Sequence, residues 1–184
     1  NGSEGNGGGI AILNSIVSIS ESNISDNVSQ NSGGGIYVDN SNLSLDNTFI
    51  NNNTGVAGGG IFINFNSTPI ITNCTLEGNF STDPSSGGGG IAAHGNSNFI
   101  LEGSILRNNI ASDDGGGIYI SNSNPTITNT IFSNNSTSDK GGGIYLTSAS
   151  ANISYCLFNN NSGWDRGGAM SAGYSSEFII KNST

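Results

Sequence analysis

The sequence predicts an all-β fold, a right-handed parallel β-helix solenoid of about seven coils, and three observations support this prediction. A glycine-rich motif, Gly-Gly-Gly-Ile in most copies, returns at intervals of 26, 25, 30, 27, 26 and 26 residues. An asparagine ends an apolar stretch at nearly the same period. Short alternating apolar and polar segments fill each interval, without the 3.6-residue periodicity of a helix. We therefore expect residues 1–184 to form one β-helix domain.

The glycine motif sets the register of the coil. An alternating segment such as Ile118–Ile120 follows each glycine run, and its first and third residues face the same side of a strand. Two further alternating segments follow, as in Leu43–Leu45 and Cys74–Leu76, so we expect three strands per coil. Stacked coils bring equivalent residues into columns spaced by about 4.8 Å. The column after the glycines is an interior ladder formed by Ile10, Ile36, Ile61, Ile91, Ile118, Ile144 and Met170.

The repeated asparagines form a second ladder. We expect these side chains to lie inside a turn, where stacked amides hydrogen-bond along the axis and satisfy the backbone of the turn. This structural ladder begins at Asn1 and continues through Asn27, Asn53, Asn79, Asn109, Asn135 and Asn161.

Two apolar columns alternate with the interior ladders and are predicted to point outward. Exposed apolar columns favour contact with a sugar, a loop or a neighbouring molecule. The first column is a contact stripe on the strand after the glycines, formed by Tyr37, Phe62, Tyr119 and Tyr145. The second lies on the third strand and contains Phe49, Ile105, Ile131 and Leu157.

Three aspartates, Asp113, Asp139 and Asp165, precede the glycine run by two residues in consecutive coils. Coil stacking would place them about 5 Å apart, which leaves three interpretations: a structural turn, a cation site of the calcium type, or catalytic carboxylates. Lys140 and Arg166 follow two of the aspartates and relieve their repulsion, which favours the turn. We assign no catalytic residue, no bound cofactor and no metal, with calcium at these aspartates as the alternative.

The cysteines and the histidine do not form a recognisable metal or disulfide site. Cys74 and Cys156 fall in one column three coils apart, about 14 Å by strand spacing, which excludes a mutual disulfide and favours buried packing. His94 is the single histidine, so a zinc site lacks ligands.

The composition excludes several partners. Only 4 Lys and Arg stand against 13 Asp and Glu, and this net charge of -9 disfavours nucleic acids and anionic membrane surfaces. We expect no membrane span, because no apolar run approaches about 18 residues. Asn-x-Ser/Thr sequons are frequent and predict N-glycosylation, with the best candidates at Asn42, Asn52, Asn73, Asn134, Asn152 and Asn160.

The Gly-Gly-Gly-Ile motif recurs together with an aromatic or aliphatic residue three positions before the ladder asparagine, as in Phe132–Asn135 and Phe158–Asn161. This pattern resembles the repeat of polymorphic outer membrane proteins over essentially the whole chain. The resemblance implies an extracellular, surface-displayed β-helix associated with adhesion, and it implies no catalytic residues. The chain departs from that repeat by having glycine where the family has alanine, which returns only at Ala169, and by lacking a membrane barrel segment.

Three functions remain as hypotheses. The chain begins and stops at nearly the same phase of the coil, which predicts a slice of a longer solenoid or copies that stack head to tail. A non-enzymatic, extracellular or cell-surface filament or stalk is therefore the leading expectation. The alternatives are an adhesin-like passenger that binds glycans or a host surface, and a polysaccharide lyase or hydrolase. The last needs a groove bounded by insertions, and the one insertion lies near Phe80–Gly87.

Overall fold

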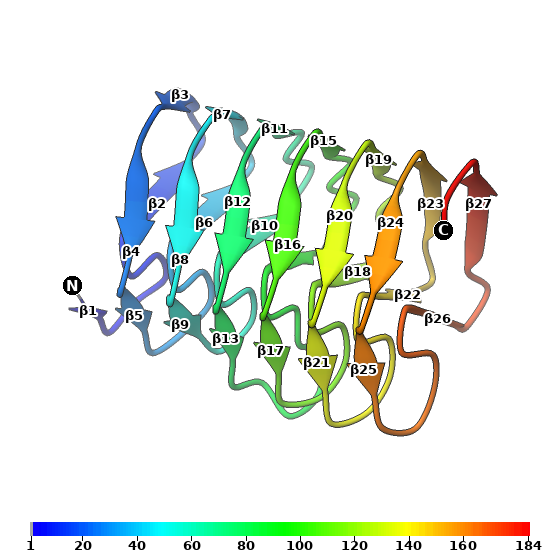
Figure 1. Ribbon diagram of the computed structural model, residues 1–184. Coiled ribbons are helices and arrows are strands. Elements are labelled where there is room, and N and C mark those ends of the chain that lie inside the picture. The colour runs from blue at the N-terminus through cyan, green and yellow to red at the C-terminus, as the bar shows by residue number, and fades with distance from the viewer. Residues whose placement is uncertain (1) are drawn as a thin grey trace.

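The computed structural model describes residues 2–184 as a continuous parallel β-solenoid (Figure 1). Asn1, the first member of the expected asparagine ladder, lies outside the described residues. Equivalent strands of successive coils pair in parallel and in register, as Ile61 does with Ile36 on one side and Ile91 on the other. The glycine and asparagine marks therefore count successive coils, as predicted. The described residues include no helix that could cross a membrane.

The strands form four parallel sheets, named A to D here in the order in which the chain enters them. Sheet A contains two-residue strands: β1 (Gly2–Ser3), β5 (Val28–Ser29), β9 (Thr54–Gly55), β13 (Phe80–Ser81), β17 (Ile110–Ala111), β21 (Ser136–Thr137) and β25 (Ser162–Gly163). Sheet B follows the glycine runs: β2 (Ile10–Leu13), β6 (Ile36–Asp39), β10 (Ile61–Asn64), β14 (Ile91–Ala93), β18 (Ile118–Ser121), β22 (Ile144–Thr147) and β26 (Met170–Gly173).

The other two sheets complete each coil. Sheet C contains β3 (Ile16–Ser20), β7 (Asn42–Asp46), β11 (Ile70–Thr72), β15 (Ile100–Glu102), β19 (Thr126–Thr128), β23 (Ser150–Ser154) and β27 (Glu177–Lys181). Sheet D contains β4 (Asn23–Ser25), β8 (Phe49–Asn51), β12 (Thr75–Glu77), β16 (Ile105–Arg107), β20 (Ile131–Ser133) and β24 (Leu157–Asn159).

The prediction of three strands per coil is wrong, because the coil has a fourth strand in sheet A. Each strand of this sheet has only two residues, and its inward position is Ser29, Gly55 or another small residue rather than a large apolar one. An alternation of apolar and polar residues needs four or more positions to be recognised. Backbone pairing between coils therefore defines sheet A, and the side-chain pattern does not.

Apolar side chains from sheets B, C and D fill the interior. The isoleucine ladder is fully buried from Ile36 to Ile144, and Leu45, Ile71 and Leu101 form a parallel buried column in sheet C. In sheet D the corresponding column ends with Phe132 and Phe158, whose rings stack at 4.8 Å. A single coil cannot bury this face alone, so stacking provides most of the apolar burial.

The asparagine ladder lies at the corner between sheets D and A and is hydrogen-bonded at every described step. The Oδ1 atom of Asn109 accepts from the backbone N and from Nδ2 of Asn79, at 3.1 and 2.9 Å. Its Nδ2 donates to Oδ1 of Asn135 and to the carbonyl oxygen of Leu76, at 3.0 and 2.9 Å. A buried amide thus makes all four of its side-chain hydrogen bonds, as the ladder hypothesis required.

The glycine runs lie at the corner between sheets A and B, where successive coils approach most closely. Gly115 has φ of +69°, a conformation that glycine adopts without steric cost. A Cβ atom on Gly116 would lie 2.5 Å from the backbone oxygens of both Gly142 and Ser136. Close backbone stacking therefore requires glycine here.

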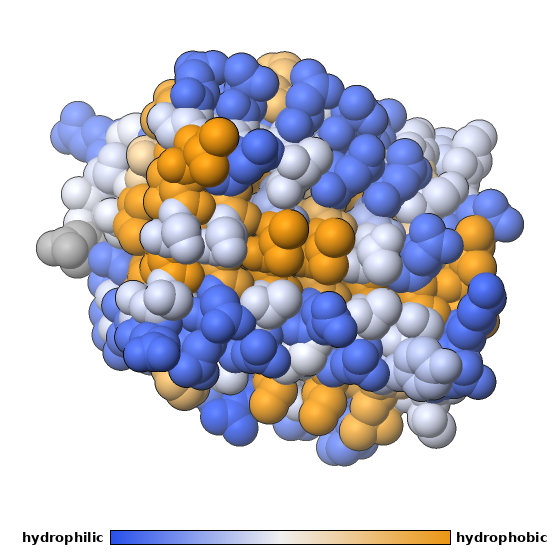
Figure 2. All heavy atoms as spheres, turned by 90° about the horizontal axis from the view of Figure 1, so that it is seen from above, coloured by the Kyte–Doolittle hydropathy of each residue, from blue (hydrophilic) through white to orange (hydrophobic). Residues whose placement is uncertain are grey.

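The predicted outward contact stripe is not exposed, which corrects that expectation. Tyr37, Phe62, Tyr119 and Tyr145 are only 6–8% exposed, because their rings stack along the axis and pack with the Ala57 corner. The column of sheet D is different, since Phe49 and Leu157 are 52% and 44% exposed. Sheet C also presents apolar side chains, including Ile70 and Ile100, and Figure 2 shows a row of them along this face.

Candidate functional site

The stacked rings of sheet B lie next to the polar residues of the corner between sheets A and B. The column has an alanine, Ala92, where the other central coils have an aromatic residue. His94 fills this gap from two positions later, and its ring lies 5.2 Å from the rings of both Phe62 and Tyr119. Its Nε2 atom is buried without a hydrogen-bond partner, and burial lowers the pKa of His94. His94 therefore acts as a neutral member of an aromatic stack.

The three predicted aspartates share one backbone column but not one carboxylate cluster. The backbone N of Asp139 donates to the carbonyl of Asp113 at 3.1 Å, and that of Asp165 donates to Asp139 at 2.8 Å. However, the carboxylates that meet belong to Asp113, Asp114 and Asp139, with one oxygen from each within 4.8 Å of the others. Asp165 instead pairs with Arg166 at 3.2 Å. Asp114, which the sequence analysis did not single out, takes the place expected for Asp165.

Lys140 neutralises part of this acidic group. Its ammonium bonds the carboxylate of Asp139 and lies 3.9 Å from Oδ1 of Asp114, which also accepts the backbone N–H of Lys140 at 3.0 Å. Calcium takes six to eight oxygen ligands in proteins. Three carboxylates, two of which already face an ammonium, fit that requirement poorly.

Burial and mutual repulsion shift the acidities of this group. Burial, reinforced by the charge of Asp113, raises the pKa of Asp114 to about 6. Burial and the charge of Asp139 also raise the pKa of Asp113. The hydrogen bond that its ammonium donates to Asp139 raises the pKa of Lys140. At neutral pH the lysine is therefore charged, and Asp114 is an acid that titrates near physiological pH.

A groove of about 580 Å³, here called the charged groove, lies beside this group at the last two coils. The corner between sheets A and B provides two acid–base pairs, Asp139 with Lys140 and Asp165 with Arg166. Strand β26 and Tyr174 after it also line the groove. The remaining groove residues are Tyr145, Ser171, Ala172 and Gly173.

Two tyrosines line the groove, Tyr145, which is buried, and Tyr174, which is exposed. Tyr145 ends the stack of sheet B, and the Lys140 ammonium lies 6.0 Å from the centre of its ring. Tyr174 is 82% exposed and has φ of +38°, an uncommon conformation for a bulky residue. Sequence reasoning missed Tyr174, because the equivalent turn residues of the two preceding coils are Ser148 and Asn122, so no residue type repeats there.

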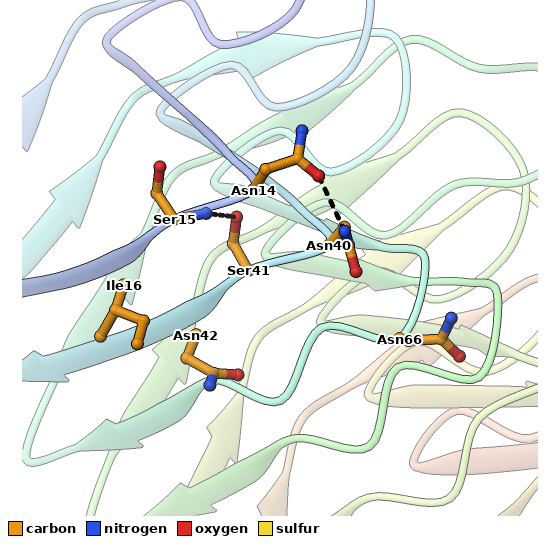
Figure 3. Close-up of a pocket in the computed structure, with 7 residues that line it drawn as sticks. All are labelled: Asn14, Ser15, Ile16, Asn40, Ser41, Asn42 and Asn66. Carbon is orange, nitrogen blue, oxygen red and sulfur yellow. Dashed lines mark hydrogen bonds between the residues drawn. The ribbon is translucent and has the colours of Figure 1, made fainter.

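A second hollow, of about 290 Å³, lies at the corner between sheets B and C near the first coils (Figure 3). It is lined by amides and hydroxyls, with Asn40 Nδ2 donating to Asn14 Oδ1 at 2.7 Å and Ser15 N donating to Ser41 Oγ at 3.0 Å. These groups mostly bond one another. The hollow therefore has neither the charged groups nor the exposed aromatic ring of the charged groove.

The other predicted residues lie apart from this groove. The six glycosylation candidates Asn42, Asn52, Asn73, Asn134, Asn152 and Asn160 are all exposed, whereas the ladder residue Asn79 is fully buried. Their modification stays a prediction. Cys74 and Cys156 are buried and unpaired, and burial raises the pKa of the Cys74 thiol to about 11, which disfavours the reactive thiolate.

Comparison with known proteins finds one matching family. Residues 1–184, the whole chain, match the family described as the right handed beta helix region. The chain belongs to the right-handed β-helix family. No curated protein and no solved structure matches it. This β-helix family includes both pectate lyase-like enzymes and non-enzymes, so membership agrees with either a surface or structural repeat protein or a polysaccharide-active enzyme.

Proposed function

We propose that this protein is a non-enzymatic, extracellular surface β-helix of the adhesin-like kind, which binds glycans through the charged groove. The observation that carries the proposal is the composition of the groove, which combines the exposed ring of Tyr174 with carboxylates, an ammonium and a guanidinium. Ligand sites combine apolar surface with a few convergent polar groups in volumes of about 300–1,000 Å³. Sugars present both hydroxyls and C–H faces, so they can use both kinds of group.

Surface display is supported by the repeat and by the construction of the solenoid. The resemblance to polymorphic outer membrane protein repeats favours an extracellular passenger. The continuous ladders favour a stiff rod, because each coil is fixed to its neighbours by in-register strands and by the asparagine amides.

Polysaccharide cleavage is the alternative supported by the acidic group. A carboxylic acid whose pKa is raised to about 6, as for Asp114, could act as a general acid near neutral pH. Against this role, Asp114 is 6% exposed, and its carboxylate faces Lys140. We therefore favour binding without cleavage.

The experiment is a binding screen against a panel of tetrasaccharides, with mass analysis of each sugar after long incubation. Arg166→Ala removes an exposed cation of the groove, and Lys181→Ala removes an exposed cation of the same coil on sheet C. We expect Arg166→Ala to weaken binding about tenfold and Lys181→Ala to leave it unchanged. Shortened sugars would establish an enzyme instead. Absence of binding to every sugar would refute the glycan-binding proposal.

Head-to-tail self-association is a second candidate function, favoured by the polarity of the ladder. At each step an asparagine accepts from the coil before it and donates to the amide of the coil after it. A coil is thus complementary to a translated copy of itself, and copies of the chain could extend the rod.

Matched variants in β27 test this assembly. Ile180 stands in the interior column with Ile153, whereas its neighbour Ile179 points outward like Asn152. If copies of the chain stack, Ile180→Lys should reduce the fraction of oligomers measured by analytical ultracentrifugation, and Ile179→Lys should leave it unchanged. A wild-type chain that remains monomeric at all concentrations would rule out self-association.

A further inference from the structure

We infer that the ligand of the charged groove is an uncharged saccharide, lying with one sugar face on Tyr174 and its hydroxyls on the two acid–base pairs. This inference rests on the proposed function, since it names the chemical class of the glycan. Three observations support it: the charge of the groove, the pairing of its cations with carboxylates, and the exposure of Tyr174.

The charge balance of the groove disfavours an acidic sugar. Two cations, Lys140 and Arg166, line it together with the carboxylates of Asp139 and Asp165, and Asp113 and Asp114 lie directly behind Lys140. The whole chain carries a net charge of -9. A uronate or sulfate would therefore add negative charge to a region where carboxylates already outnumber cations.

Both cations are already paired with carboxylates. Lys140 bonds Asp139 and lies near Asp114, and Arg166 Nε bonds Asp165 at 3.2 Å. An anionic sugar on Lys140 would compete with two carboxylates, and one on the remaining N–H groups of Arg166 would lie beside the carboxylate of Asp165. A hydroxyl avoids this repulsion, because it can donate to the carboxylate and accept from the remaining guanidinium N–H groups. Asp165 and Arg166 are 54% and 71% exposed, so both retain hydrogen-bonding capacity.

Tyr174 provides the surface on which a sugar ring can lie. The corner after β26 holds Tyr174 and Ser175 at φ of +38° and +51°, and the phenol remains 82% exposed instead of joining the sheet B stack. The same turn has positive φ in other coils, as at Asn40, Asn122 and Ser148, so the exposed tyrosine side chain and not the backbone distinguishes this coil. An exposed ring in the same groove as two hydrogen-bonding pairs can serve both the C–H face and the hydroxyls of an uncharged pyranose.

Isothermal titration of the full chain tests the inference. The uncharged probes are cellotetraose and mannotetraose, and the acidic probes are tetragalacturonate and a chondroitin sulfate tetrasaccharide. We expect binding of at least one uncharged probe and at least tenfold weaker binding of both acidic probes. Binding of acidic probes alone would overturn this inference while leaving glycan binding intact. Binding of no probe would overturn both.

A pair of tyrosine variants locates the site. Tyr174→Ala and Tyr155→Ala each remove an exposed tyrosine from a corner with positive φ, but only Tyr174 lines the groove. Tyr174→Ala should weaken binding of the uncharged probe about tenfold or more, and Tyr155→Ala should not change it. Equal affinity in both variants would show that the sugar binds elsewhere. Thermal unfolding of each variant checks that both remain folded.

Discussion

Two corners of the same coil follow opposite rules. At the corner between sheets D and A, every described coil from the second onward has the same asparagine, and its amide bonds its neighbours in the same way. At the corner between sheets A and B, the glycine backbone repeats, but the residues before it change from Val56–Ala57 to Asp113–Asp114, Asp139–Lys140 and Asp165–Arg166.

The difference shows which positions of a solenoid can evolve a site. An amide that is hydrogen-bonded on both sides must be matched by the coils before and after it, so the column stays uniform. Where only backbone atoms stack, the side chains beside them are unconstrained and can differ from coil to coil. The charged groove lies at the second kind of corner, and four predictions test the comparison.

The largest effect should come from breaking the asparagine ladder. Asn109→Leu leaves Asn79 without its acceptor and the Leu76 carbonyl without its donor, all of them buried. Each buried unsatisfied group costs about 1–3 kcal/mol, so we expect a loss of roughly 3 kcal/mol or more in urea unfolding. Asn108→Gly, at an exposed neighbour with φ of +56°, should change stability by less than about 0.5 kcal/mol. Similar losses in the two variants would contradict the ladder's role.

Breaking the backbone contact of the other corner should cost somewhat less. Gly116→Ala inserts a Cβ atom between two backbone oxygens at 2.5 Å, which should destabilise the chain by about 2–3 kcal/mol. In Gly5→Ala the nearest atom lies at 3.6 Å, so that variant should resemble wild type in thermal unfolding. If Gly116→Ala were as stable as wild type, the backbones of successive coils could move apart at this corner, and close stacking would not require glycine.

Making a side-chain column more regular should stabilise the molecule. His94→Phe keeps a ring between Phe62 and Tyr119 and removes the buried, unpartnered Nε2 atom. We expect a gain of up to about 1 kcal/mol, whereas His94→Ala should lose about 1–2 kcal/mol of aromatic contact. We expect the melting temperature to be highest for His94→Phe, intermediate for the wild type and lowest for His94→Ala. The reverse order of Phe and His would show that the imidazole has a polar role.

The smallest effect is the pH dependence that the acidic group gives to the stability of the folded chain. The pKa of Asp114 is raised to about 6 in the folded chain, and an unfolded aspartate titrates near 3.8. The folded state therefore binds the additional proton between these values, so stability is greatest below the lower one and falls as pH rises through about 6. The raised pKa of Asp113 acts in the same direction.

Asp114→Asn is the matched test of this pH dependence. The contribution of the Asp114 carboxyl should make the wild-type chain melt a few degrees higher at pH 4.5 than at pH 7.5. The variant should show a smaller difference, because the amide carries no charge at either pH. An unchanged difference would assign the pH dependence to other carboxylates.

The sequence predicted the features that repeat, and it missed those that occur once. The coil period and the asparagine ladder were predicted because hydrogen bonds and interior packing impose the same residue type on each column. Asp113 and Asp139 were identified by the same reasoning. Asp114 and Tyr174 were not, because Asp114 joins the acidic group, and Tyr174 the groove, through neighbours in adjacent coils and not through a repeated residue type.

The sequence by itself thus determined the solenoid, its register and its interior ladders, since period and side-chain alternation are local properties of the chain. Only the tertiary structure decided that the coil has four strands, because sheet A is defined by backbone pairing between coils. It also decided that the aromatic column is buried and that Asp165 turns to Arg166 rather than to Asp139. The physical reason is that exposure and charge pairing depend on what the adjacent coil and corner place beside a residue.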